Sequence, residues 1–191
     1  MVKWVAAATS RCRGRSLEGF RSRMIMLQTE RLLLREMTEA DAGQLVRLGQ
    51  NPNVTRYLPD TPPAGVEEAV RQLQTVIFPQ YAHRIGRWAV IRRDTGAFIG
   101  WCGVKYYADV NEYDLGYRYF EEHWSRGYAT EAAQAVLRYG IEQLRGARIV
   151  GKAMVDNAGS RRVLEKIGLS FEGYAVEECG EVAVYALTTP A

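Results

Sequence analysis

The stretch "LGYRYFEEHWSRGYATEA", residues 115–132, joins a strand-like segment to a helix-like one. Aromatic side chains are frequent over 112–120, as in a strand, and apolar residues recur at helical spacing over 127–145. The helix opens with Arg126-Gly127 and has no acidic side chain before Glu131. Acidic residues are favoured at a helix start, because the N-terminus carries partial positive charge. An acid-free start therefore predicts a site that receives an anion from outside.

The residues at this helix start suit a phosphate group. Gly127 has no Cβ, so the backbone can approach a ligand closely, and Ala129 is small for the same reason. Ser125, Arg126 and Thr130 add hydrogen-bond donors, and Arg126 adds charge. A simple turn at Gly127 beside a solvated arginine accounts for the same residues, and the sequence has no P-loop pattern. The loop alone leaves both interpretations open.

A second helix start lies in "VDNAGSRRVLEKIGLSFEG", residues 155–173. Asp156 or Asn157 is suited to cap this helix, Ser160 falls in its first turn, and Gly168 is suited to end it. Ordinary capping accounts for this motif taken by itself. Two such helix starts, each directly after a predicted strand, favour anion binding over ordinary capping.

The predicted elements follow the order β-αα-βββ-α-β-α-ββ. Strands are predicted over 31–36, 87–93, 97–107, 112–120 and 147–155, with two closing strands around Gly180. Helices are predicted over 38–50, 65–78, 127–145 and 156–168, and the proline-rich segment 51–63 is predicted to be a loop. This mixture predicts an α/β domain of the α+β type, with one mixed, mostly antiparallel sheet of about seven strands flanked by helices.

Length and charge indicate one folded domain. The 191 residues are 47% hydrophobic, which is enough for a single core. Residues 1–23 carry a charge balance of +5, whereas residues 24–191 carry −2. We therefore expect a basic N-terminal extension over 1–23 and one domain over 24–191. The extension is open to interpretation as an unstructured arm, a targeting segment or an upstream start. The near-neutral domain disfavours nucleic-acid binding.

Other residue types exclude several classes of protein. The sequence contains no run of about 18 apolar residues, so we expect no membrane span. Cys12, Cys102 and Cys179 form no CxxC pair, so we expect neither a disulfide framework nor a zinc site. We expect instead a reducing, cytoplasmic setting. His83 and His123 lie 40 residues apart, and we expect no metal.

Together these segments resemble the GNAT superfamily of acyl-CoA-dependent N-acyltransferases over about residues 28–189. Within it, the chain is most similar to the branch of the ribosomal-protein alanine and serine N-acetyltransferases. The resemblance rests on the order and spacing of the stretch quoted first and of "TERLLLREMTEADA", "NPNVTRYL", "DTGAFIGWCGV" and "DNAGSRRVLEKIGLSFEG". It implies a single GNAT-like domain with acetyl-CoA as the acetyl donor.

The resemblance also implies which residues contact coenzyme A. The family's loop pattern is Gln or Arg, two free positions, Gly, one free position, then Gly or Ala. Here it is matched by Trp124-Ser125-Arg126-Gly127-Tyr128-Ala129, with a departure at Trp124. The amides of residues 125–130 would hold the pyrophosphate. The strand edge around Tyr117 and Tyr119 would hydrogen-bond the pantetheine arm, which Asn157 would also contact.

The resemblance puts the usual proton donor in doubt. Many members carry a tyrosine seven residues after the asparagine, thought to protonate the leaving thiolate, but this chain has Leu164 there. In the ribosomal-protein branch, a serine at the position of Ser160 has been proposed instead. Ser160 is therefore the candidate for steadying or protonating the thiolate.

Acetyl transfer to an amine requires the neutral amine, so a carboxylate that takes its proton assists catalysis. Glu112 and Asp114 lie on the same face of their strand, because strand side chains alternate. The family's base is often on this strand, and Asp114 occupies the acidic position two before Gly116. Both acids are equally consistent with a solvated strand end, and Glu177 and Glu178 on the last hairpin are further candidates.

These residues predict an acetyl-CoA-dependent N-acetyltransferase. We expect direct transfer, without an acyl-enzyme, to a primary amine: a protein N-terminal α-amine or a small-molecule amine. The acceptor would meet loop 51–64, which contains Arg56, Tyr57 and Asp60. The missing tyrosine keeps a second hypothesis open, a GNAT-fold module that binds acyl-CoA as a sensor without catalysis. A monomer and a homodimer are equally compatible with the sequence.

Overall fold

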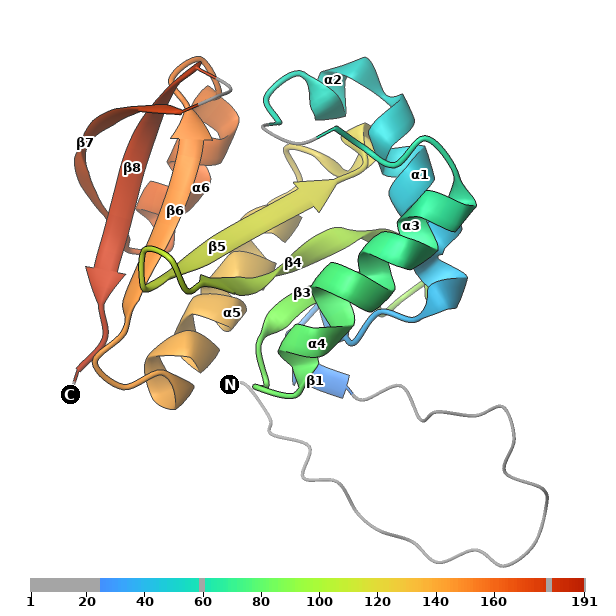
Figure 1. The fold of residues 1–191 in the computed structure, drawn as a ribbon, viewed down its shortest axis with the longest axis horizontal. Helices are drawn as coiled ribbons and strands as arrows, with labels where there is room; N and C mark the ends of the chain where they lie inside the picture. Colours follow the sequence, from blue (N-terminus) through green and yellow to red (C-terminus); the bar gives the residue numbers. More distant parts are fainter. Residues whose placement is uncertain (1–24, 59–60, 178–179, 191) are drawn as a thin grey trace, which may run out of the picture.

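A computed structural model describes residues 25–58, 61–177 and 180–190 of the chain. The expected basic extension, residues 1–23, lies outside them, as do Asp60 and Glu178 of the predicted site. The described residues form one sheet with helices on both faces (Figure 1). This architecture confirms the predicted α/β class.

The sheet has eight strands in the order β1-β2-β3-β4-β5-β6-β8-β7. Neighbouring strands are antiparallel except β5 and β6, which are parallel. The strands are β1 (Ile25–Gln28), β2 (Leu32–Arg35), β3 (Gly86–Arg92), β4 (Phe98–Tyr107), β5 (Glu112–Tyr119), β6 (Arg148–Met154), β7 (Ser170–Glu177) and β8 (Gly180–Thr188).

The helical segments occupy most of the predicted positions. They are η1 (Glu39–Asp41), α1 (Ala42–Gln50), α2 (Pro52–Thr55), α3 (Val66–Gln72), the π-helical turn η2 (Leu73–Ile77), α4 (Phe78–Tyr81), η3 (Glu121–His123), α5 (Tyr128–Gln143) and α6 (Ala158–Lys166). The predicted helix 65–78 is thus a helix with a π-helical turn inside it, continuing through α4 to Tyr81.

The structure refines two sequence predictions. The sheet has eight strands rather than about seven, because Ile25–Gln28 pairs antiparallel with β2 and buries Leu27 in the core. The predicted loop 51–63 contains the short helix α2. Pro52 is tolerated at its first position because the N–H there needs no partner, and the Asn51 side chain accepts a hydrogen bond from the Asn53 amide at 2.9 Å.

Alternation along the strands assigns side chains to two cores. On β4, Cys102 and Val104 pack in the core covered by α5, whereas Trp101 packs in the core covered by α1 and α3. On β5, Leu115 and Tyr119 also belong to the α5 core. Odd residues of β5 therefore face α5, and even residues face the side that carries α1–α4.

A buried ion pair fixes the turn from β2 into α1. The guanidinium of Arg35 donates to both carboxylate oxygens of Asp41, at 2.8 and 2.7 Å, and both side chains are less than a tenth exposed. The Thr38 amide adds a hydrogen bond to the same carboxylate at 2.8 Å. Burial alone raises the pKa of Asp41, but the hydrogen bonds and charge of Arg35 and the bond from Thr38 lower it below its ordinary value.

We expect Asp41→Asn to lower the free energy of unfolding by about 3 kcal/mol or more at pH 7, because Arg35 is left buried without a counter-charge. The loss should shrink as pH falls through the folded-state pKa of Asp41, since a carboxyl with a lowered pKa stabilises the fold only while ionised. Urea unfolding at several pH values measures both effects. Glu122→Gln, which breaks an exposed pair with Arg47, is the control and should change little. Equal losses in the two variants would contradict this account.

Candidate functional site

The two edges of β5 are paired very differently. Toward β4, β5 is paired along its whole length, from Glu112 to Tyr119. Toward β6, its pairs among the described residues are Tyr113 with Ile149 and Asp114 with Val150. Beyond them the two strands diverge (Figure 1). The second half of β5 therefore has one edge without a partner strand in the described part of the chain, and such an edge can accept an extended ligand as an added strand.

Backbone alternation shows which β5 peptide groups face this edge. The amide of Phe120 donates to the carbonyl of Ile99, which immediately follows Phe98 on β4. Peptide groups alternate sides along an antiparallel strand, so those of Tyr117 and Tyr119 point away from β4. The Trp124 indole N–H donates to the Tyr119 carbonyl at 3.0 Å. Tyr117 thus offers its peptide groups at the predicted position, whereas the Tyr119 carbonyl is engaged by Trp124.

The start of α5 is a helix N-terminus that no side chain of the described residues caps, at the position where the sequence predicted an anion site. Gly127 is its N-cap, with φ of 77°, and no described side chain caps the helix. Ser125 also has a positive φ, 57°. The N–H groups of Tyr128, Ala129 and Thr130 have no acceptor within the helix, because the first turn of any α-helix leaves its donors unpaired. Since residues 125–127 are exposed, these amides form a concave set of donors that fits a phosphate.

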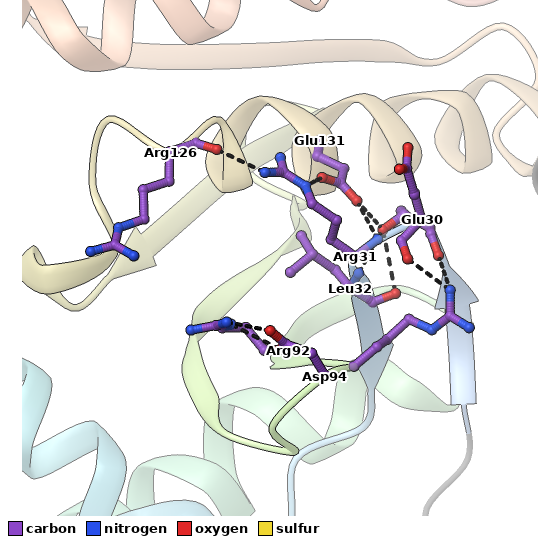
Figure 2. A network of polar contacts seen from close by, with 9 residues as sticks. Glu30, Arg31, Leu32, Arg92, Asp94, Arg126 and Glu131 are labelled. Carbon is purple, nitrogen blue, oxygen red and sulfur yellow. Dashed lines mark hydrogen bonds and ion pairs between the residues drawn. The ribbon is translucent and has the colours of Figure 1, made fainter.

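Glu131, the first acid of α5, is bound to the β1–β2 turn. Its Oε1 accepts from the Thr29 hydroxyl at 2.6 Å and from the Arg31 amide at 2.9 Å, and its Oε2 accepts from Arg31 Nε at 2.6 Å. Arg31 also donates to the carbonyl of Arg126 at 3.0 Å (Figure 2). Burial raises the pKa of Glu131, but the bonds from Thr29 and Arg31 outweigh it and lower that pKa. The Glu131 carboxylate is therefore bound by the β1–β2 turn and does not compete with a ligand for the N-terminus of α5.

Tyr128 and Arg126, both named from the sequence, lie differently. The Tyr128 ring is buried, with the Arg31 guanidinium carbon 4.7 Å and the Arg92 guanidinium carbon 5.9 Å from its centroid. The side chain of Arg126 is exposed and directed away from Glu131 (Figure 2). The ring of Tyr128 therefore packs beneath the loop, and a ligand can reach only its amide. The exposed guanidinium of Arg126, in contrast, can contact a ligand directly.

The structure brings three predicted residues together across the divergence of β5 and β6. The hydroxyl of Tyr117 lies 2.9 Å from Ser160 Oγ and 3.0 Å from the Ser160 carbonyl oxygen, within hydrogen-bond distance of both. Asn157, the N-cap of α6, accepts from the Ser160 amide at 3.0 Å. Leu164, at the position of the family's tyrosine, is 1% exposed and packs against Gly151.

Asp114 is held by a buried arginine that sequence reasoning missed. Arg87 on β3 forms a short ion pair with Asp114 Oδ2 and donates to the carbonyls of Gly103 and Asp114 at 2.6 and 3.0 Å. A Cβ on Gly116 would lie 2.8 Å from this guanidinium, so the glycine makes room for it. The signal that could have indicated this contact is Arg87 at an inward position of β3, with Gly103 on the neighbouring strand and Gly116 on the strand after it.

The other candidate acids are also paired. Glu112 accepts from Arg148 Nε at 2.9 Å, and Arg148 also binds Glu172. Lys152 donates to Glu177 at 2.5 Å. The hydrogen bonds that Arg148 donates to Glu172 and Glu112 raise its pKa. These ion pairs join β6 to β5 and to β7.

The predicted acceptor loop is bonded to the segment after β5. Asn51 and Asn53 each donate a side-chain N–H to the carboxylate of Glu121, at 2.8 and 2.9 Å. Arg56 stacks over the ring of Tyr57 at 5.1 Å. Glu121 begins the segment that leads to residues 125–130. These hydrogen bonds therefore link the predicted acceptor loop to the start of α5.

Cys102 is the free thiol of the described chain and belongs to the core. Burial raises its pKa to about 12, so the thiolate, the reactive form, is scarce at neutral pH. The described residues contain no group of three His, Cys, Asp or Glu side chains able to hold a metal ion. Among them, too, no helix is long and apolar enough to cross a bilayer.

Comparison with known proteins identifies the family. The model of the acetyltransferase (GNAT) domain matches residues 31–170. The chain therefore belongs to the GNAT acetyltransferase family, as the sequence motifs indicated. A relative described as the uncharacterized N-acetyltransferase YoaA, from Bacillus subtilis, is 35% identical over 149 residues, covering 78% of this chain and 84% of that protein.

Solved structures agree with the family assignment. An acetyltransferase from Agrobacterium tumefaciens is 27% identical, with a TM-score of 0.73 over 92% of this chain and 100% of that one. RimL, a ribosomal alpha-N-protein acetyltransferase solved in complex with coenzyme A, has a TM-score of 0.74 at 18% identity, covering 87% of this chain and 98% of that one. At this identity the likeness to RimL concerns the fold.

We expect Glu131→Gln to lower the free energy of unfolding by about 1–2 kcal/mol at pH 7, because three hydrogen bonds lose their charged acceptor in a partly solvated setting. The difference from the parent should vanish as pH falls through the folded-state pKa of Glu131, which is lowered. Urea unfolding at pH 7 and in acid tests this expectation. A difference that persists unchanged in acid would show that the carboxylate charge is irrelevant there.

Proposed function

We propose that this protein is an acetyl-CoA-dependent N-acetyltransferase that transfers acetyl directly to a primary amine. The observation that carries the proposal is the open edge of β5, which leads within a few residues to the uncapped N-terminus of α5. An extended arm and a phosphate joined to it are the two parts of coenzyme A that such a site would bind. Both parts of the site lie on one continuous segment of chain.

The residues present fit the proposed donor substrate. The amides of residues 125–130 would hold the pyrophosphate, assisted by the exposed Arg126. The peptide groups of Tyr117 would bind the pantetheine arm as a neighbouring strand would. Asn157 at the start of α6 lies across from Tyr117 where β5 and β6 diverge beyond Asp114 and Val150, and the opening denotes this divergence. When bound, acetyl-CoA supplies the activated acetyl group.

Asp114 is the proposed base. Arg87 holds Oδ2, and within the described residues no hydrogen bond reaches Oδ1, which can therefore accept the amine proton. Neutralising an α-amine of pKa about 8 at pH 7 costs roughly 1.4 kcal/mol, against about 4.6 for a lysine. A protein N-terminus or a small amine of similar basicity therefore places the smaller demand on this carboxylate.

Direct transfer is favoured over an acyl-enzyme. A covalent mechanism needs an accessible nucleophile with a base beside it. The thiol of Cys102 is fully buried with a raised pKa. Attack by the bound amine needs only the carboxylate and the donors already present. The acceptor would approach over the face that carries Asp114 and past Arg56 and Tyr57. Similarity of fold to ribosomal-protein acetyltransferases supports a protein N-terminus as one acceptor class to test.

We expect the full chain to bind acetyl-CoA in calorimetric titration with micromolar affinity, and Gly127→Asp to abolish the binding. The new carboxylate would occupy the helix N-terminus and repel the pyrophosphate. Gly146→Asp is a matched control, since Gly146 also has a positive φ, 64°, and a Cβ there meets open space. Equal affinity in the parent and Gly127→Asp would remove the pyrophosphate from this loop, and no binding in the parent would overturn the proposal.

We expect Asp114→Asn to slow thiol release from acetyl-CoA in the presence of an amine by about 10²- to 10⁴-fold, the usual effect of losing a general base. Binding of acetyl-CoA should be unchanged. A panel of N-terminal peptides and small amines serves as acceptor, and Asp109→Asn on the exposed β4–β5 turn is the control. An unchanged rate would exclude Asp114 as the base. Binding without turnover on any amine would favour the sensor hypothesis.

A further inference from the structure

The contact between Tyr117 and Ser160 has a role that backbone binding by Tyr117 does not explain. It joins β5 to α6 where these elements are no longer connected through the β5–β6 pairing, which ends at Asp114. The two residues are 43 positions apart in the chain. The Tyr117 ring packs against the α5 core, and its hydroxyl reaches across to the first turn of α6.

Ser160 is held from two directions. Asn157 accepts a hydrogen bond from its amide, and Tyr117 contacts its Oγ and its carbonyl. One turn further along α6, Leu164 is buried against Gly151 and has no hydroxyl. The hydroxyl that α6 itself supplies here is therefore that of Ser160, and the β5 hydroxyl in contact with it is that of Tyr117.

The two hydroxyls can be arranged in two ways. If Tyr117 donates to the Ser160 carbonyl, the Ser160 hydroxyl donates its hydrogen to the Tyr117 oxygen. If Tyr117 donates to Ser160 Oγ, the serine hydrogen is left for a ligand in the opening. Donors in such a chain polarise one another, so the second arrangement makes Ser160 a better donor. Burial raises the pKa of Tyr117, so its hydroxyl keeps its proton at neutral pH.

We propose that Tyr117 is a positioning residue that donates to Ser160 Oγ and thereby directs the serine hydroxyl at the leaving sulfur of the thioester. The inference rests on the proposed function, because it needs the arm of coenzyme A to end in this opening. The arm would run along the open edge of β5 from the start of α5 toward the point where pairing with β6 closes the edge at Asp114.

The step balances without a further reagent. The carbon–sulfur bond breaks, the electron pair stays on sulfur, and the amine nitrogen forms the new bond to the acetyl carbon. The proton lost by the amine goes to Asp114 and then to solvent. Ser160 keeps its proton and stabilises the thiolate by a hydrogen bond. A hydrogen bond to a charged group shifts an equilibrium by about tenfold or more.

The ionisation of the thiol of bound coenzyme A tests this role without an acceptor amine. Coenzyme A is added to the full chain, and the ultraviolet absorbance of the thiolate is followed as pH rises. We expect Tyr117→Phe to reduce the ratio of thiolate to thiol of bound coenzyme A about tenfold at a given pH. Tyr139→Phe, which removes a hydroxyl bonded to the Arg84 carbonyl away from the site, should match the parent.

A second variant separates positioning from a general structural effect. If Tyr117 acts through Ser160, Tyr117→Phe should have no further effect in a Ser160→Ala background, because residues acting as one unit are not additive. An unshifted thiol in Tyr117→Phe, or additive shifts in the double variant, would overturn the inference while leaving the proposed function intact. Failure of the parent to bind coenzyme A would overturn both.

Discussion

The parallel pairing of β5 with β6 is the constraint on which the candidate site depends. Two residue pairs hold the N-terminal and C-terminal parts of one sheet together, at Tyr113 and Asp114. Longer pairing would satisfy more backbone groups, but it would also cover the edge of β5. The helices α5 and α6 contact each other on one face and share a core with β5 and β6. Packing thus keeps the sheet together where hydrogen bonding does not, and the unpaired edge remains for a ligand.

A second constraint acts at the start of α5, where a helix N-terminus must stay free of its own acid. The first acid of the helix, Glu131, is kept away from the N-terminus because Thr29 and Arg31, in a turn about 100 residues earlier, bind its carboxylate. The same arginine bonds the carbonyl of Arg126. These bonds tie Arg126 and Glu131 to the β1–β2 turn, and the first-turn amide hydrogens of α5 are left without an acceptor in the helix.

Local signals predicted most of the fold. The aromatic strand, the glycine turn and the helical periodicity around Gly127 lie within one stretch of chain, and the structure has the predicted strand and helix there. The short strand β1 was missed because four residues beside a basic segment give no periodicity. Helix α2 was missed because the several prolines of segment 51–63 are typical of a loop, although Pro52 begins a helix turn.

Long-range contacts at the site could not be predicted in the same way. Whether Arg87 reaches Asp114, or Tyr117 reaches Ser160, depends on strand register and on the crossing of α6 over the sheet. A family motif names Ser160 and Asn157, but it gives no information on which β5 side chain meets them. The residues on the β5 strand were identified for their backbone and their charge, and their side-chain partners came only from the three-dimensional arrangement.

The two asparagines that bind Glu121 have a consequence for how this enzyme can evolve. They belong to the segment that would face the acceptor, yet their partner lies at the entrance to the loop that would hold the donor. A change selected at Asn51 or Asn53 to admit a new amine would also alter the segment before Ser125. Under the proposed function, a substitution at Asn51 or Asn53 would therefore act on both the acceptor side and the donor side of the site.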